Sequence, residues 1–209
     1  MKNHRRTYYD LFSRFYDRFV ALHSSDLQGD LRRFLAQNIP ENKAGVVLDL
    51  CTGTASLLPA LSEKVGPKGQ VVGVDFSGGM LQVAREKTKS YDNVRLIEAD
   101  ICTLPFRANT FDAVTCSYAF YELKGDAQDT VLKEVRRLLR PSGVFLMMEH
   151  DLPENAFIRT LFYIRLASMG AKRAISILRY EKSFLESYFP KVEKIVTPSR
   201  RTKIMMCGN

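Results

Sequence analysis

The chain has 209 residues, of which 45% are hydrophobic and 26% charged, a composition that fits one globular domain and excludes a disordered chain. No apolar run approaches the roughly 18–20 residues that a membrane-spanning helix needs, and we expect no signal peptide because the basic N-terminus leads into a mixed segment. The formal net charge of +8 has its excess toward both ends, which leaves a partner of opposite charge and ordinary solubility both open.

The first residues form a helical pattern and the middle of the chain alternates between strand and helix. Residues from about 8 to 38 are amphipathic, and we expect a helical cover over 1–40 in front of a larger domain at 41–209. From residue 45 onward the alternation indicates a parallel sheet with helices on both faces. The expected strands are 45–49, 70–75, 94–99, 111–117 and 143–149, and the expected helices are about 56–65, 79–90 and 127–139. Ser77 is the expected N-cap of the second of these helices.

The last third of the chain adds a helical segment and two further strands. A patterned stretch at about 155–178 predicts a helical insertion over about 154–180. Strands are expected at 192–197 and 202–207, with a turn at 198–200 between them. The expected fold is therefore α/β: a Rossmann-like, seven-stranded, mostly parallel sheet with a C-terminal antiparallel hairpin.

The cysteines lie far apart and form no CxxC pair. They are Cys51, Cys102, Cys116 and Cys207. This spacing is typical of reduced thiols in a cytoplasmic protein and not of a disulfide or zinc framework. We expect a cytoplasmic location and no metal site.

The stretch after the first expected strand points to a cofactor. An apolar run containing Asp49 leads into a turn of small residues around Gly53, and the next apolar run ends in Asp75. This layout is typical of a nucleotide-type cofactor held over the carboxyl ends of parallel strands, with an acid on the neighbouring strand for its ribose. A dinucleotide fingerprint needs three glycines here, and Cys51 and Ser56 stand at the outer two places. A cofactor without phosphates makes a smaller demand on the turn.

Five segments resemble the motifs of class I S-adenosylmethionine-dependent methyltransferases, in the family's order, and more narrowly the ubiquinone/menaquinone methyltransferase branch. They are 47–55 (VLDLCTGTA), 72–81 (VGVDFSGGML), 98–106 (EADICTLPF), 109–114 (NTFDAV) and 139–143 (LRPSG). The chain departs from the usual first motif at Cys51 and Ala55, where the family has its outer glycines. The resemblance implies S-adenosyl-L-methionine as the cofactor and S-adenosyl-L-homocysteine as the product.

The resemblance also implies a division of labour among the cofactor residues. Asp75 would take the ribose diol, Asp100 and Ile101 the adenine, and Asp49 with Gly53 the methionine end. Taken singly, Asp49 and Asp75 also read as ordinary acids at strand ends. The expected cofactor-binding set is Asp49, Cys51, Thr52, Gly53, Asp75, Phe76, Met80, Asp100, Ile101 and Ser117.

The methyl acceptor is expected at the ends of the fourth and fifth strands, where such folds place substrate. The expected catalytic residues are Tyr118, Tyr121 and His150. His150 suits a general base because the ordinary pKa of histidine lies near neutral pH, and a solvated loop histidine is the alternative. The loop at 116–120 differs from the Asn/Asp-Pro-Pro-Tyr/Phe loop of enzymes that methylate DNA bases or glutamine, so nucleic acid is not favoured.

The expected function is methyl transfer by in-line displacement to a small-molecule or lipid-like acceptor. A non-catalytic protein that binds S-adenosylmethionine as a sensor or scaffold is the alternative. The segment at 154–180 reads as a helical lid over the acceptor pocket, and the basic residues of 155–178 also suit peripheral contact with an anionic membrane. The identity of the acceptor, the atom that is methylated and the oligomeric state stay open.

Overall fold

The computed structural model describes residues 29–123, 126–152, 156–168 and 180–208. Most of the expected N-terminal cover, residues 1–28, lies outside the described residues, as do residues 169–179 of the expected lid. The division into a cover, a domain and a lid therefore stays a prediction.

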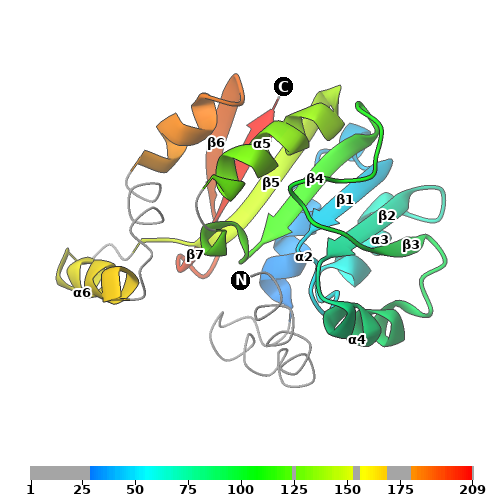
Figure 1. Ribbon diagram of the computed structural model, residues 1–209, viewed down its shortest axis with the longest axis horizontal. Coiled ribbons are helices and arrows are strands. Elements are labelled where there is room, and N and C mark those ends of the chain that lie inside the picture. Colours follow the sequence, from blue (N-terminus) through cyan, green and yellow to red (C-terminus); the bar gives the residue numbers. More distant parts are fainter. Residues whose placement is uncertain (1–28, 124–125, 153–155, 169–179, 209) are drawn as a thin grey trace.

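A seven-stranded sheet with the order β3-β2-β1-β4-β5-β7-β6 forms the centre of the fold (Figure 1). β1 to β5 run parallel, and β7 pairs antiparallel with both β5 and β6. This confirms the expected mostly parallel sheet with a C-terminal antiparallel hairpin. The strands are β1 (Val46–Leu50), β2 (Gln70–Asp75), β3 (Val94–Glu98), β4 (Phe111–Ser117), β5 (Leu139–His150), β6 (Lys191–Val196) and β7 (Thr202–Gly208).

Helices cover both faces of this sheet. In Figure 1, α5 crosses in front of β4 and β5, while α2 and α3 lie behind the sheet. Ser77 caps α4 as expected, because its hydroxyl accepts a 3.1 Å hydrogen bond from the N–H of Met80. The helices are α2 (Asp30–Gln37), α3 (Leu58–Val65), α4 (Gly78–Thr88), α5 (Ala127–Leu138) and α6 (Ala156–Ser168), with short 3₁₀ turns η1 (Glu41–Lys43) and η2 (Phe120–Glu122) and a further helix over 180–186.

The starts of two elements, β5 and α3, differ from those expected from the sequence. β5 begins at Leu139 and not at 143, because Leu139 pairs with Phe111 before the register shifts and pairing resumes between Ala113 and Val144. α3 begins at Leu58 and not at 56, since Ala55 has a φ of 62°, a conformation that a right-handed helix does not contain.

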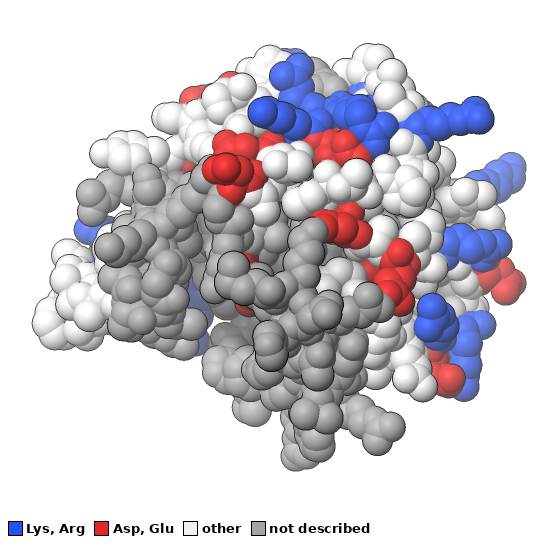
Figure 2. All heavy atoms as spheres, viewed as in Figure 1, with Lys and Arg blue, Asp and Glu red and all other residues white. Residues whose placement is uncertain are grey.

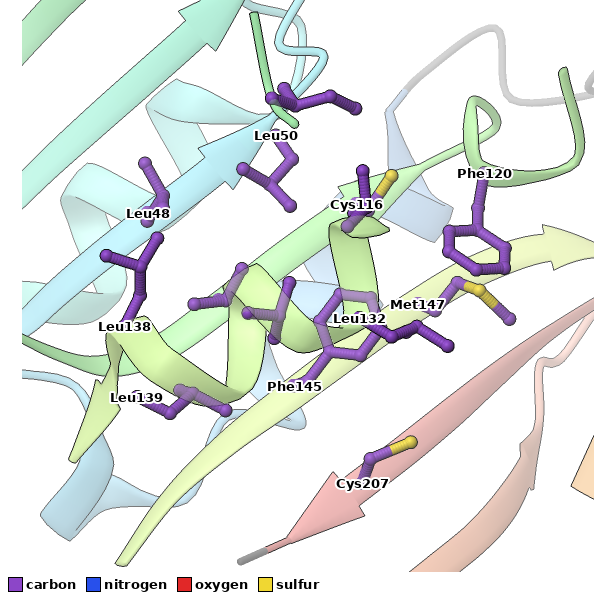
Figure 3. Close-up of a cluster of buried hydrophobic side chains, with 14 of the residues drawn as sticks. Leu48, Leu50, Cys116, Phe120, Leu132, Leu138, Leu139, Phe145, Met147 and Cys207 are labelled. Carbon is purple, nitrogen blue, oxygen red and sulfur yellow. The ribbon is translucent and has the colours of Figure 1, made fainter. Parts of the chain in front are cut away.

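The core forms one hydrophobic cluster on each face of the sheet. Leu48 and Leu50 of β1 point toward α5, where Leu132 and Leu138 meet them together with Phe145 of β5 (Figure 3). The preceding β1 residue Val47 joins the other cluster, with α2 and α3. This alternation follows from the period of two in a strand. Full burial of such a side chain contributes about 1.5–3 kcal/mol to the free energy of folding. The two clusters therefore stabilise the strands whose ends carry the candidate site.

Charged side chains of both signs lie on the face of the molecule shown in Figure 2. On the face shown in Figure 2, acidic side chains lie beside most of the basic ones. Arg137 pairs with Glu134 and Arg140 with Asp112, each at 2.5 Å. Basic side chains also lie side by side along the upper edge of this view. Among the described residues, no helix combines the length and apolar character that crossing a membrane requires.

Candidate functional site

The loop after β1 turns sharply over the carboxyl end of the sheet. Cys51, Gly53 and Ala55 all have positive φ angles, of 52°, 55° and 62°. A non-glycine residue in this region is disfavoured by roughly 1–2 kcal/mol. Cys51 and Ala55 thus keep a glycine-like backbone at the two places where the first motif usually has glycine. The N–H of Thr52 donates a 2.9 Å hydrogen bond to the carbonyl of Val74, which fastens the turn to β2.

Gly73 allows this turn to lie close to β2. A Cβ atom at Gly73 would come within 2.8 Å of the Leu58 Cδ1 atom and 3.0 Å of the Thr52 Cγ2 atom. Both contacts are with side chains, so a larger residue would displace the side chains of Leu58 and Thr52. Glycine therefore favours close packing at this position, and Gly73 is also the register partner of Asp49.

Asp75 joins the loops that follow β1 and β2. Its carboxylate accepts hydrogen bonds of 2.9 Å from the N–H groups of Gly53 and Ser77. The side chain is buried, with 5% of the residue exposed. These two contacts hold the carboxylate at the point where β2 ends. Phe76 follows Asp75 in the sequence, and 37% of this residue is exposed.

Asp49 lies beneath the turn, between β2 and β4. Its carboxylate accepts a 2.7 Å hydrogen bond from the hydroxyl of Thr115, its register partner on β4. Burial raises the pKa of Asp49 to about 6, while the hydroxyls of Thr115 and Thr52 act in the opposite direction. Asp49 is therefore an acid whose charge is only moderately favoured at neutral pH, and a cation near it would favour the ionised form.

The third motif lies beside the second. The N–H of Ala99 donates to the carbonyl of Asp75 at 3.0 Å, and the N–H of Cys102 donates to the Asp100 carboxylate at 3.0 Å. Asp100 is exposed, while Ile101 is buried. The two expected adenine residues are thus adjacent to the expected ribose acid. Met80 is buried on α4, and Ser117 ends β4 half-buried.

Tyr118 and His150 come together at the ends of β4 and β5. Their ring centroids lie 4.9 Å apart. Tyr118 has a φ of 55°, and its hydroxyl lies 3.1 Å from that of Thr202. The His150 side chain is exposed. The two expected catalytic side chains therefore lie together at the ends of β4 and β5, Tyr118 half-buried and His150 exposed.

Tyr121 does not join this pair. Tyr118 packs against the cluster on the α2 and α3 face, whereas Tyr121 packs against the cluster on the α5 face. The Tyr121 hydroxyl donates a hydrogen bond to the Glu181 carboxylate. The three residues expected to be catalytic thus divide into two groups on either side of the sheet.

Three polar residues of this region were not predicted from the sequence. Thr115 stands within an apolar strand, and its pairing opposite Asp49 is set by register. Glu181 and Lys203 come from the least motif-like part of the chain, and they form a buried ion pair with each other. The burial of Lys203 inside β7 carries no local signal, because the preceding residues Arg200 and Arg201 are exposed and equally basic.

Known proteins match this chain in sequence and in fold. The family model described as a methyltransferase domain matches residues 47–143. The demethylmenaquinone methyltransferase of Staphylococcus epidermidis is 34% identical over 161 residues, covering 77% of this chain and 66% of that protein. The Staphylococcus aureus enzyme of the same name is 37% identical over 150 residues, covering 72% of this chain and 61% of that protein.

The fold also has solved counterparts. A S-adenosylmethionine-dependent methyltransferase from Aquifex aeolicus superposes with a TM-score of 0.62 at 20% identity, covering 89% of this chain and 95% of that one. At that identity the likeness concerns the fold, and the sequence relatives carry the family. The chain belongs to the class I S-adenosylmethionine-dependent methyltransferases, with S-adenosyl-L-methionine as the family's cofactor.

Proposed function

We propose that the protein transfers a methyl group from S-adenosylmethionine to a lipid-like phenolic acceptor of the quinol class. The observation that carries this proposal is the 34–37% identity with demethylmenaquinone methyltransferases. The aligned part spans 66% and 61% of those relatives' lengths, so their substrate is transferred to this chain only as a proposal.

The residues at the rim fit the cofactor. S-adenosylmethionine carries no phosphate, and the turn keeps side chains at Cys51 and Ser56, where a pyrophosphate would need glycines. The Asp75 carboxylate, at the end of β2 beside the first turn, suits a ribose diol. Asp49 and the backbone around Gly53 suit the ammonium and carboxylate of the methionine end. Phe76, Met80, Asp100, Ile101 and Ser117 complete the proposed set together with Cys51 and Thr52.

The chain's own contribution to catalysis is alignment and the exclusion of water. When bound, the cofactor supplies an electrophilic methyl group on a sulfonium. Holding acceptor and methyl group in line can lower the barrier by roughly 7–11 kcal/mol. We assign His150 the role of proton acceptor for the quinol, with Tyr118 beside it at 4.9 Å between ring centroids. Tyr121 is assigned to the other side of the acceptor.

An assay of methyl transfer tests this function. Protein would be incubated with cofactor labelled in its methyl group and with a short-chain demethylmenaquinol, a thiol, an amine or a phospholipid. We expect label on the quinol alone, and a fall of about 10²-fold or more in His150→Gln, the range of general-base contributions. Cofactor binding without transfer to any of these acceptors would contradict the proposal and favour the sensor or scaffold alternative.

A lipid-like acceptor implies access to a membrane, and α6 offers a surface for it. Of the six exposed large apolar residues in the described chain, Phe157, Leu161 and Ile164 lie on α6. Their spacing of four and three residues places them on one face of the helix. In Figure 1, α6 lies at the end of the molecule, away from the sheet. Together with the net charge of +8, this face suits an anionic lipid surface.

Vesicle co-sedimentation tests this contact. We expect the protein to sediment with vesicles rich in phosphatidylglycerol and less with phosphatidylcholine alone. Leu161→Glu should abolish sedimentation, whereas Thr160→Glu, at the neighbouring exposed position, should reduce it less. Equal sedimentation of Leu161→Glu and wild type would contradict the contact. We accordingly propose a cytoplasmic protein that is peripheral to the membrane, which the four free cysteines also support.

A further inference from the structure

Tyr121 is held at its backbone by a buried acid. The Glu149 carboxylate accepts hydrogen bonds from the N–H of Phe120, at 2.8 Å, and from the N–H of Tyr121, at 3.4 Å. On the other side of the same peptide, the amide of Gln128 donates to the carbonyl of Phe120 at 3.2 Å. Glu149 and Gln128 are 3% and 0% exposed. The turn after β4 is thus fixed by polar groups from β5 and α5.

The side chain of Tyr121 is held by a second buried acid. Its hydroxyl donates to Glu181, on the helix over 180–186, and Glu181 also forms an ion pair with Lys203 of β7. The Lys203 ammonium lies 5.7 Å from the centroid of the Tyr121 ring. It is also 3.9 Å from Asp151. Lys203 is also the cross-strand register partner of Glu149. Charged groups from β5, β7 and the helix over 180–186 therefore lie around Tyr121.

Burying these charged groups costs folding free energy, and a fixed geometry is the benefit that can offset this cost. Removing an ion from water costs several kcal/mol, and well-packed apolar residues often replace a buried ion pair without loss of stability. Glu181 and Lys203 are 7% and 2% exposed, on the face of the sheet that α5 covers. Buried polar networks of this kind hold their members in one orientation.

The direction of the hydrogen bond determines what Tyr121 offers a ligand. Burial, followed by the negative charge of Glu181, raises the pKa of Tyr121 well above its usual value, so the phenol keeps its proton. That proton is committed to Glu181. The lone pairs of the phenol oxygen are consequently the part of the hydroxyl left to accept a hydrogen bond.

We infer that Glu181 and Lys203 are positioning residues, which orient the Tyr121 hydroxyl so that its oxygen accepts a hydrogen bond from the hydroxyl of a phenolic methyl acceptor. This inference rests on the proposed function, since it specifies the chemistry of the acceptor. A phenol whose O–H donates to a fixed oxygen gains electron density on its ring carbons. The same contact would orient the ring toward the methyl group, and acceptors without a donor hydroxyl would be disfavoured.

Steady-state kinetics with the short-chain quinol tests this role. Tyr121→Phe and Glu181→Gln should each lower kcat by about tenfold to a hundredfold, the size of a lost hydrogen bond to a reacting group. The dissociation constant of the cofactor, from calorimetry, should be unchanged. Tyr188→Phe is the matched control, because Tyr188 also donates to a carboxylate, that of Asp129 at 2.6 Å. We expect wild-type kcat and KM from it.

A double variant separates orientation from stability. If Glu181 acts through Tyr121, the variant that combines Tyr121→Phe with Glu181→Gln should be no slower than Tyr121→Phe alone. Rates that multiply in the double variant, or wild-type kcat in Tyr121→Phe, would overturn the inference. If Glu181→Gln does not fold, Tyr121→Phe decides, because it removes a single oxygen. Failure of wild-type protein to methylate the quinol would instead overturn the proposed function.

Discussion

The Asp75 carboxylate accepts a 2.9 Å hydrogen bond from the N–H of Gly53. The acid expected to hold the ribose and the glycine of the first motif are therefore one unit, although 21 residues separate them in the chain. A change at either residue will be felt at the other. This linkage explains how a first motif with only one of its usual glycines keeps its shape.

Gly53→Ala should weaken cofactor binding more than it weakens the fold. Gly53 and Gly66 have φ angles of 55° and 68°, and a Cβ at Gly66 would meet nothing within 4 Å. Alanine at Gly53 carries the left-handed strain of roughly 1–2 kcal/mol. Alanine at Gly66, whose ψ is −177°, costs at least as much, because that region of positive φ admits almost only glycine. We expect both variants to lose unfolding free energy in urea denaturation, and about tenfold weaker cofactor binding from Gly53→Ala alone. Equal cofactor affinities in the two variants would argue against the role of this turn.

Thr115→Val should destabilise the protein more at high pH than at low pH. The Thr115 hydroxyl donates to Asp49, whose folded pKa is raised to about 6 by burial. Above that pH the carboxylate is ionised and would lose a donor, a cost of about 1–3 kcal/mol. At pH 5 the carboxyl is mostly protonated and the loss is smaller. Urea denaturation at pH 5 and pH 8 measures this difference, with Thr115→Ser as the control that keeps the hydroxyl.

Glu149→Gln should become more stable relative to wild type as the pH rises. Burial raises the folded pKa of Glu149 from its usual 4.5 to about 8. The folded state therefore binds a proton that the unfolded state releases, and the stability of wild type falls as the pH rises through this window. Each unit of pKa shift corresponds to about 1.4 kcal/mol. Glutamine removes the titration while its oxygen can still accept from Phe120 and Tyr121.

Melting temperatures of both proteins between pH 5 and pH 9 check this. Glu86→Gln, at an exposed position on α4, is the control and should follow wild type at every pH. A constant difference between Glu149→Gln and wild type across this range would show that Glu149 does not titrate there.

Much of the fold follows from local patterns in the sequence. The strands that become β2 and β4 have the expected bounds, because turn residues stand at both ends of each apolar run. The predicted start of β5 was four residues too late. Arg140 and Pro141 have the sequence character of a loop, and only the pairing of this segment with β4 makes them part of a strand. Pairing across a sheet is a property of the tertiary structure, which a local reading does not contain.

The site could be predicted to the extent that each residue follows its own strand. Asp49, Asp75 and Asp100 stand at successive strand ends, and the parallel order brings these ends to one rim. Glu181 and Lys203 could not be predicted in this way. Their contact depends on how the helix over 180–186 packs against β7, and nothing in either segment specifies it.

Calorimetric titration of S-adenosylmethionine into wild type and Asp75→Ala tests the central claim most directly. We predict binding to wild type and a loss of affinity of about tenfold or more in Asp75→Ala, because the carboxylate both binds the ribose and holds Gly53. Glu86→Ala, which removes an exposed acid of α4, should bind as wild type does. Absence of binding to wild type, or equal affinity in Asp75→Ala, would contradict the account.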